Sequence, residues 1–175
     1  MVSSEQQGLR NYWTDWFEGL APSYAYHAGS ILGAIRFKLV TRSLLEHLGS
    51  TPAKVIDVGG GYGEQAIMLA RAGHDVVVVD PDETMLEIAR ARVSAESKQV
   101  QSRVRLVQGF GEQAIDLVGS GYDLACCHSV LMYLPDPTPM LRSLIRLLRP
   151  APDRRADIDS DPQRTRPRHA PRAAW

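Results

Sequence analysis

Residues 55–70, VIDVGGGYGEQAIMLA, pass from an apolar run into a glycine-dense turn and then into an amphipathic stretch. The apolar run predicts a buried strand at Lys54–Val58, and the residues after the turn predict a helix at Glu64–Ala72. The glycines of the turn are Gly59, Gly60, Gly61 and Gly63. They permit positive φ and let a ligand approach main-chain amides at a helix N-terminus. A turn without a ligand is the alternative, but four glycines in five positions would lose much conformational entropy for turning alone. The segment therefore predicts a site for a nucleotide-type ligand.

Strands and helices alternate along the rest of the chain. Further strands are predicted at Asp75–Asp80, Val104–Gln108 and Tyr122–His128, and the first of these is Val-rich, as is typical of a strand buried on both faces. Helices are predicted at Ser30–Leu48, Asp82–Val93, Glu112–Leu117 and Thr138–Leu148, the last with an apolar face of Met140, Leu141, Leu144, Ile145 and Leu148. This alternation predicts an α/β fold with a parallel sheet of at least four strands.

Length and composition indicate one compact domain, since 175 residues with 44% apolar content leave no room for a second. We assign residues 1–29 to an aromatic and polar lead, 30–150 to the ligand-binding domain and 151–175 to a disordered tail. The lead has no apolar run long enough for a signal peptide or a membrane span, so we expect a cytoplasmic protein without a membrane partner. Residues 1–150 hold 14 Lys and Arg against 16 Asp and Glu, which argues against general nucleic-acid binding. A local basic patch could still serve a specific RNA.

The two cysteines, Cys126 and Cys127, are adjacent within an apolar run. A disulfide between neighbours would strain the backbone, and the pair lacks the C-x-x-C spacing of redox and zinc sites. We expect both to be reduced core residues, and the motifs indicate no metal site.

The identity of the ligand depends on Asp57, which lies two residues before the turn. The segment from Gly61 to Ala66 matches the dinucleotide pattern G-x-G-x-x-A, and Asp80 follows at a suitable distance, so NAD is one candidate. Counted from Gly59, however, the sequence is D-x-G-x-G-x-G. A carboxylate at Asp57 would repel a pyrophosphate, whereas it suits the ammonium and sulfonium charges of S-adenosylmethionine. Asp57 therefore favours S-adenosylmethionine.

Asp80 ends the second predicted strand, where the carboxyl ends of parallel strands meet. Its carboxylate can accept hydrogen bonds from both ribose hydroxyls, or it can cap the helix that begins after Pro81. Pro81 and Met85 are candidates to cover an adenine ring, with a place in the helix core as the alternative for Met85.

Together these motifs resemble the class I S-adenosylmethionine-dependent methyltransferases, whose fold is Rossmann-like. The motifs are D-x-G-x-G-x-G, the acid ending the second strand, QGFGEQ, HSVLMYLPDP and LRSLIRLLRP. Within that superfamily, GAIRFKL, IDVGGGYGEQAIMLA and HSVLMYLPDP most resemble the tRNA 5-carboxymethoxyuridine methyltransferases. The resemblance extends from Gly33 to Pro150.

The resemblance implies roles for several residues in holding the cofactor. Arg36 would bind its carboxylate, Gly59 and Gly60 its methionine portion, Asp80 its ribose, Gly111 would offer main chain to the adenine, and His128 would line the pocket. A guanidinium can bind a carboxylate with two hydrogen bonds, but an arginine on a helix can also point to water. A packed, hydrogen-bonded histidine is the alternative for His128.

The chain departs from the family at two places. Phe110 stands where many members have an Asp for the adenine amino group, so adenine recognition would depend on main chain and stacking. After Pro150, the family continues with a fifth apolar strand and two more, whereas this chain has a tail of Arg, Pro and Asp. We therefore expect the last three strands to be missing and hypothesise that residues 151–175 are out-of-frame coding sequence. The downstream DNA tests this hypothesis, which fails if no frame encodes the missing strands.

The resemblance implies methyl transfer, an in-line displacement that needs positioning rather than a metal. The implied acceptor is a carboxylate on a modified tRNA uridine, which needs no general base. A nitrogen or hydroxyl acceptor would need one, and His128 is the first candidate for that catalytic role. The alternatives are a small-molecule methyltransferase, an inactive truncated product that only binds cofactor, and a fragment of an NAD-type oxidoreductase.

Overall fold

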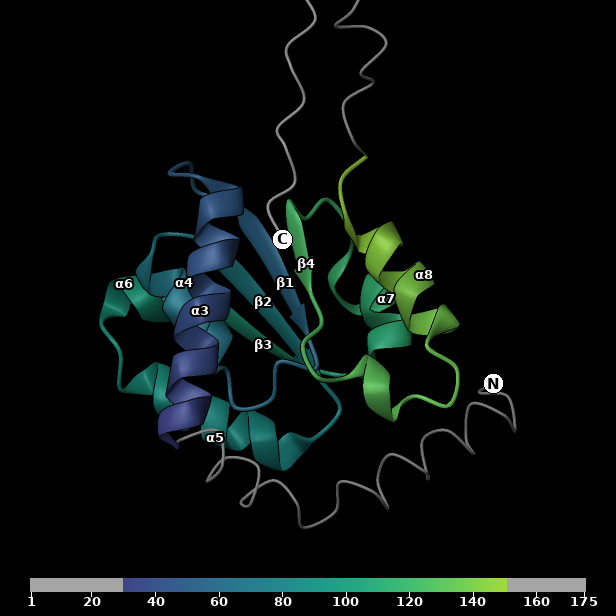
Figure 1. Ribbon diagram of the computed structural model, residues 1–175, viewed down its shortest axis with the longest axis horizontal. Helices are drawn as coiled ribbons and strands as arrows, with labels where there is room; N and C mark the ends of the chain where they lie inside the picture. Colours follow the sequence, from purple (N-terminus) through teal and green to yellow (C-terminus); the bar gives the residue numbers. More distant parts are fainter. Residues whose placement is uncertain (1–29, 151–175) are drawn as a thin grey trace, which may run out of the picture.

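A computed structural model describes residues 30–150, which form a four-stranded parallel sheet flanked by helices (Figure 1). The strands are β1 (Lys54–Val58), β2 (Asp75–Asp80), β3 (Val104–Gln108) and β4 (Leu124–Cys126), in the order β3-β2-β1-β4. The sheet confirms the predicted α/β class and the positions of the first three strands. Our expectations for the lead at 1–29 and the tail at 151–175 lie outside the described residues.

Helices cover both faces of the sheet (Figure 1). On one face lie α3 (Ile31–Leu48), α4 (Glu64–Arg71), α5 (Glu83–Ser94) and the short α6 (Lys98–Gln101). On the other lie α7 (Ala114–Val118) and α8 (Thr138–Leu147), with 3₁₀ turns η1 (Gly111–Gln113) and η2 (Leu131–Tyr133). Neither α6 nor η2 was predicted, because four- and three-residue elements are too short to leave a periodic pattern.

Alternate residues of the two central strands supply two cores. Val55, Val76 and Val78 pack under α4 and α5, whereas Ile56 and Val79 pack with α7 and α8 on the opposite face. All five are almost completely buried, as expected for parallel strands covered on both sides. The same alternation turns Asp57 and Asp80 toward the α4 side of the sheet.

Two predictions near the C-terminal end of the described residues were wrong in detail. The fourth strand is shorter than the predicted Tyr122–His128, because only Leu124–Cys126 pair with β1. The inward face of α8 also differs, since Leu141 is 43% and Ile145 71% exposed. Met140 is buried as predicted, together with Ser143 and Leu147, which were not assigned to this face. Leu148 leaves the helix and forms a parallel bridge with Tyr122.

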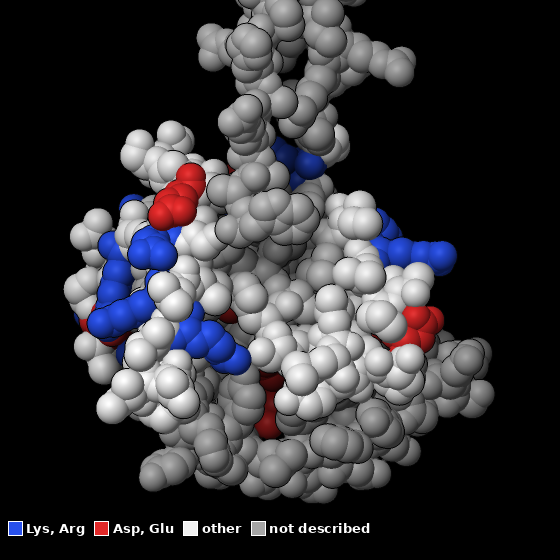
Figure 2. All heavy atoms as spheres, in the orientation of Figure 1, with Lys and Arg blue, Asp and Glu red and all other residues white. Residues whose placement is uncertain are grey.

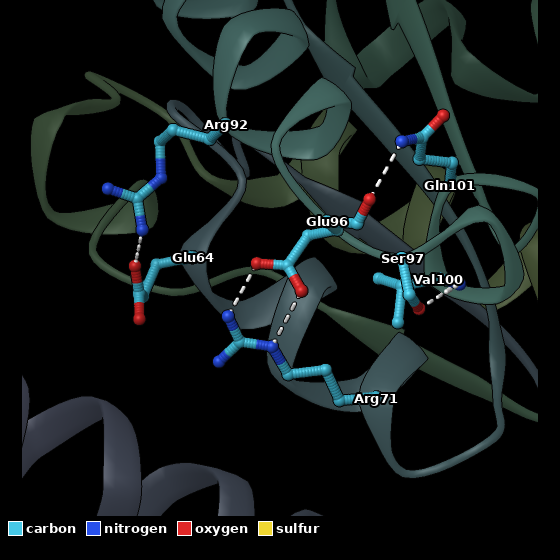
Figure 3. A network of polar contacts seen from close by, with 7 residues as sticks. All are labelled: Glu64, Arg71, Arg92, Glu96, Ser97, Val100 and Gln101. Atoms are coloured by element: carbon cyan, nitrogen blue, oxygen red, sulfur yellow. Dashed lines mark hydrogen bonds and ion pairs between the residues drawn. The ribbon is translucent and has the colours of Figure 1, made fainter.

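Polar contacts hold the helices of the α4 side in place (Figure 3). Arg71 of α4 binds Glu96 beyond α5 through two hydrogen bonds, and Arg92 of α5 pairs with Glu64 of α4. These pairs are partly exposed, so each adds little to stability. They link α4 to α5 and to the segment that follows α5.

Within residues 30–150, no helix combines the length and apolar character that a membrane crossing needs.

Candidate functional site

The glycine turn joins β1 to α4 at the carboxyl edge of the sheet. Gly59, Gly61 and Gly63 have backbone φ angles of 72°, 52° and 78°, which residues with a side chain rarely adopt. A Cβ at Gly59 would clash with Val130, and one at Gly60 would lie 2.8 Å from Oδ2 of Asp57. The turn therefore needs glycine both for its backbone conformation and for the close approach of neighbouring groups.

Asp57 lies directly beneath this turn. Its side chain is 2% exposed, and among residues 30–150 no group donates a hydrogen bond to the carboxylate. Burial, reinforced by the charge of Asp80, raises the pKa of Asp57 to about 7. A buried carboxylate without a partner destabilises a fold, so its presence points to a ligand that supplies the missing positive charge.

Asp80 is the second buried acid of this edge, and its two oxygens are already engaged. Oδ2 accepts a hydrogen bond from the Gly61 amide at 2.8 Å, and Oδ1 accepts one from the Asp82 amide at 3.0 Å. Burial raises the pKa of Asp80 to about 6 against the opposing effect of these hydrogen bonds. Each carboxylate oxygen has a second lone pair, so Asp80 can still accept from a ligand.

Asp80 is not the cap of the following helix, and that alternative was wrong. Asp82 caps α5, because its Oδ1 accepts hydrogen bonds from the amides of Thr84 and Met85 at 2.8 and 3.2 Å. The chain therefore uses separate acids for capping and for the edge of the sheet. Sequence alone did not separate them, since both precede the helix within three residues.

The end of β4 completes the site from the other side of β1. His128 lies just past the strand with an exposed side chain. Partial desolvation of its ring by the surrounding protein, together with the charge of Arg36, lowers its pKa. Arg36 comes from α3, and its Nη1 donates a hydrogen bond to Oγ of Ser129 at 3.2 Å. Arg36 is thus held at the carboxyl edge rather than pointing freely into water.

Two candidates for covering an adenine ring lie at the start of α5. Met85 is buried in a small cluster with Tyr62, which favours the core alternative for this residue. Pro81 is half-buried directly after β2, and its carbonyl accepts a long hydrogen bond from Gln108 at 3.4 Å. The ring of Pro81 is therefore the more available of the two.

Gly111 begins η1 and is buried on the α8 side of the sheet, next to the end of β1. A Cβ there would clash with Met140 and Val58, so the backbone approaches α8 closely. Its carbonyl accepts a hydrogen bond from the hydroxyl of Ser143 at 2.6 Å. Phe110 precedes it as the N-cap residue of η1.

The structure thus brings together residues from α3, β1, β2 and the end of β4. Asp57, the glycines, Asp80, Arg36 and His128 gather at one edge, as the sequence predicted for a ligand site. Sequence analysis missed Ser129, which has a φ of 58° and anchors Arg36, and Val130, which packs on Gly59. It also missed that Cys126 lies opposite Asp57 in the sheet. These contacts join residues far apart in the chain, so no local sequence pattern indicates them. Among the described residues other than glycine, only Ser129 has a positive φ.

Both cysteines are free, Cys126 buried and Cys127 half-buried, as predicted for reduced residues in or near the core.

The chain is similar in sequence to known methyltransferases. The family model described as "Methyltransferase domain" matches residues 56–151. The tRNA 5-carboxymethoxyuridine methyltransferase of Escherichia coli (strain K12) is 32% identical over 127 residues, covering 73% of this chain and 48% of that protein. A ubiquinone biosynthesis O-methyltransferase of Xanthomonas oryzae is 32% identical over 135 residues, covering 77% of this chain and 52% of that protein.

Among solved structures, the magnesium protoporphyrin IX methyltransferase of Synechocystis PCC 6803 with bound S-adenosylmethionine has a TM-score of 0.65 at 21% identity. The match covers 79% of this chain and 71% of that one, and it supports the fold. The chain spans about half the length of the curated relatives it matches.

Proposed function

Because the chain belongs to the class I S-adenosylmethionine-dependent methyltransferases, we propose that it binds S-adenosylmethionine on the Gly59–Gly63 turn and transfers its methyl group to a carboxylate on a modified tRNA uridine. The observation that carries the proposal is Asp57, a buried carboxylate with no hydrogen-bond donor among the described residues. A cationic ligand would form an ion pair with this carboxylate, whereas the pyrophosphate of NAD would place a second negative charge beside it.

Each end of the cofactor has a chemically matched group at this edge. Asp57 would pair with the ammonium group, and the guanidinium of Arg36, held by Ser129, would bind the carboxylate. The remaining lone pairs of Asp80 would accept the ribose hydroxyls. Gly111 would contact the adenine through its N–H, because its carbonyl is engaged by Ser143.

S-adenosylmethionine supplies an activated methyl group, so the task of the protein is to hold donor and acceptor in line. The glycine turn fixes the donor because its backbone is tied at both ends. The Gly59 amide donates to the carbonyl of Val79 at 2.7 Å, and the Gly61 amide donates to Asp80. A carboxylate acceptor is ionised at neutral pH and needs no residue to remove a proton.

The surface beside the site favours an anionic acceptor. Figure 2 shows Lys and Arg side chains gathered over the side of the molecule where Figure 1 has α3. From α3 itself come the exposed Lys38 and Arg42. Although the described part of the chain has no overall basic excess, this local patch is suited to the phosphates of a tRNA. The tRNA methyltransferase similarity supports the same acceptor.

A hydroxyl acceptor on a small molecule is the second candidate, and His128 is the observation that favours it. The ring is exposed at the site, and its lowered pKa keeps it neutral at physiological pH, so it can accept a proton. The O-methyltransferase similarity supports this acceptor class.

Calorimetry on the full chain tests the cofactor, with S-adenosylhomocysteine and NAD titrated separately. We expect binding of the first and none of the second; the reverse would show a dinucleotide enzyme. Transfer of labelled methyl to tRNA that bears 5-carboxymethoxyuridine then tests the acceptor, with quinol-type phenols as the alternative. Binding without any transfer would indicate a cofactor-binding product that is inactive.

The variant His128→Asn separates the two acceptor classes, with His47→Asn on the exposed end of α3 as its matched control. With a carboxylate acceptor, His128→Asn should change kcat by less than about threefold, because no proton has to be removed. With a hydroxyl acceptor, kcat should fall by roughly 100-fold or more. The control variant should retain full activity in both cases.

A further inference from the structure

Three different metal-binding side chains converge beside the glycine turn. The carboxylate of Asp57, the thiol of Cys126 and the imidazole of His128 each offer a ligand atom, and these atoms all lie within 4.8 Å of one another. A single point within about 2.8 Å of all three atoms therefore exists. Zn²⁺ binds carboxylate, thiolate and imidazole at about 2.0–2.3 Å. Small side-chain rotations that move each ligand atom inward by roughly half an ångström would therefore bring all three into bonding distance.

The sheet explains why these residues meet. Asp57 and Cys126 are directly paired across the parallel strands β1 and β4. His128 follows Cys126 by two residues, so it continues on the same face as the extended chain leaves the sheet. Two ligands are thus held by adjacent strands, and the third lies at their solvent-facing end.

From this cluster we infer that the protein has a Zn²⁺ site formed by Asp57, Cys126 and His128. Three protein ligands leave a fourth tetrahedral position, which the exposed His128 places toward solvent. On binding, the Cys126 thiol releases its proton to solvent and its sulfur coordinates the metal. The thiolate and the carboxylate together carry two negative charges, so the bound ion gives a neutral complex beneath the turn.

The site would regulate cofactor binding, a consequence that rests on the proposed function. A Zn²⁺ ion on Asp57 neutralises the carboxylate that the cofactor's ammonium group needs and occupies the space beside it. Zinc and cofactor should therefore exclude each other, and each should weaken the binding of the other by the same factor.

Cobalt titration of the full chain, free of other metals and under reducing conditions, tests the site directly. We expect one Co²⁺ per chain with a thiolate-to-cobalt charge-transfer band and visible bands of a four-coordinate ion, all displaced by Zn²⁺. Cys126→Ser should abolish the charge-transfer band, whereas Cys127→Ser should retain it. His128→Asn should weaken Zn²⁺ binding by at least about 100-fold, because loss of even an outer-shell partner weakens binding 10–100-fold. His47→Asn should bind as the wild type does.

The inference is overturned if no charge-transfer band forms, if Cys127→Ser loses it as Cys126→Ser does, or if His128→Asn binds zinc normally. His128→Asn keeps the test meaningful if Cys126→Ser fails to fold, because His128 is exposed. Titration of S-adenosylhomocysteine in the presence of a chelator separates this inference from the proposed function. Cofactor binding without cobalt binding refutes only the zinc site, and cobalt binding without cofactor binding refutes only the proposed function. Saturating Zn²⁺ should raise the Kd of S-adenosylhomocysteine at least about tenfold. An unchanged Kd would refute the regulatory role.

Discussion

The two ends of the sheet treat their acidic side chains in opposite ways. At the amino edge, Asp75 pairs with Arg103 at 2.9 Å, and Asp123 pairs with Arg149 at 2.8 Å and accepts the Lys54 amide. At the carboxyl edge, Asp57 and Asp80 are buried, and neither forms an ion pair with a described residue. The charges of the amino-edge acids are balanced by arginines of the same chain, whereas those of the carboxyl-edge acids have no counter-charge within 4 Å among the described residues.

The turns at the two edges differ in the same way. Gly73 leads into β2 at the amino edge with a φ of 101°, and nothing lies within 4 Å of where its Cβ would be. Gly59 leaves β1 at the carboxyl edge with a similar need for positive φ, but its surroundings are filled by Val130. Within residues 30–150, only the carboxyl edge combines positive φ with tight packing, which fits a preorganised ligand site.

The largest expected effect concerns pH and stability. The folded protein holds a proton on Asp57 up to about pH 7, whereas the unfolded chain loses it near 3.8. The free energy of unfolding of the ligand-free protein should therefore fall as pH rises between these values, by up to about 4 kcal/mol at 1.36 kcal/mol per pKa unit. Asp57→Asn should remove most of this decline, and Asp80, with a pKa of about 6, should account for a smaller part. Urea unfolding at about pH 4 and about pH 8 measures the effect.

Asp75→Asn is the matched control for this measurement, because it changes a paired acid of the same sheet. It should leave the decline with pH intact. An equal decline in Asp57→Asn and in the wild type would show that the carboxyl edge is not the source.

A second comparison uses glycine. Gly59→Ala and Gly73→Ala both place a Cβ at positive φ, but only the first also overpacks against Val130. We expect Gly59→Ala to lower the free energy of unfolding by about 1–3 kcal/mol more than Gly73→Ala does. Thermal or urea unfolding of the two variants measures the difference. Equal losses would mean that Val130 moves aside without strain.

The smallest effect is expected at the amino edge. Asp75→Asn breaks a pair whose carboxylate is 58% exposed, so the free energy of unfolding should change by less than about 1 kcal/mol. The loss should shrink further in high salt. A loss of several kcal/mol would show that the amino-edge pairs contribute more than their exposure suggests.

Much of the fold could be predicted because its strongest signals are local. The run before the glycines and the Val-rich strand gave β1 and β2 with their observed bounds, and the motif series identified the family that the comparisons also found. The length of β4 was overestimated because the apolar run is longer than the part that pairs with β1, and one sequence does not show which residues pair. The buried face of α8 was misassigned because Leu141 and Ile145 are apolar but lie on its exposed side.

The site was predicted as a set of positions, but its contacts were not. Asp57 and Asp80 are marked by their places at strand ends. The link from Arg36 to Ser129 spans 93 residues, and that from Ser143 to Gly111 spans 32, so both depend on tertiary packing. The meeting of Asp57 with Cys126 follows from strand order, which one sequence does not specify.

The central claim is that Asp57 provides the negative charge for the cofactor. Calorimetric titration of S-adenosylhomocysteine at about pH 8, above the raised pKa of Asp57, tests it with the wild type, Asp57→Asn and Asp75→Asn. Loss of one partner of a buried charge pair costs about 2–4 kcal/mol, so Asp57→Asn should raise Kd by roughly 30- to 1,000-fold while Asp75→Asn leaves it unchanged. Equal affinity of Asp57→Asn and the wild type would contradict the account.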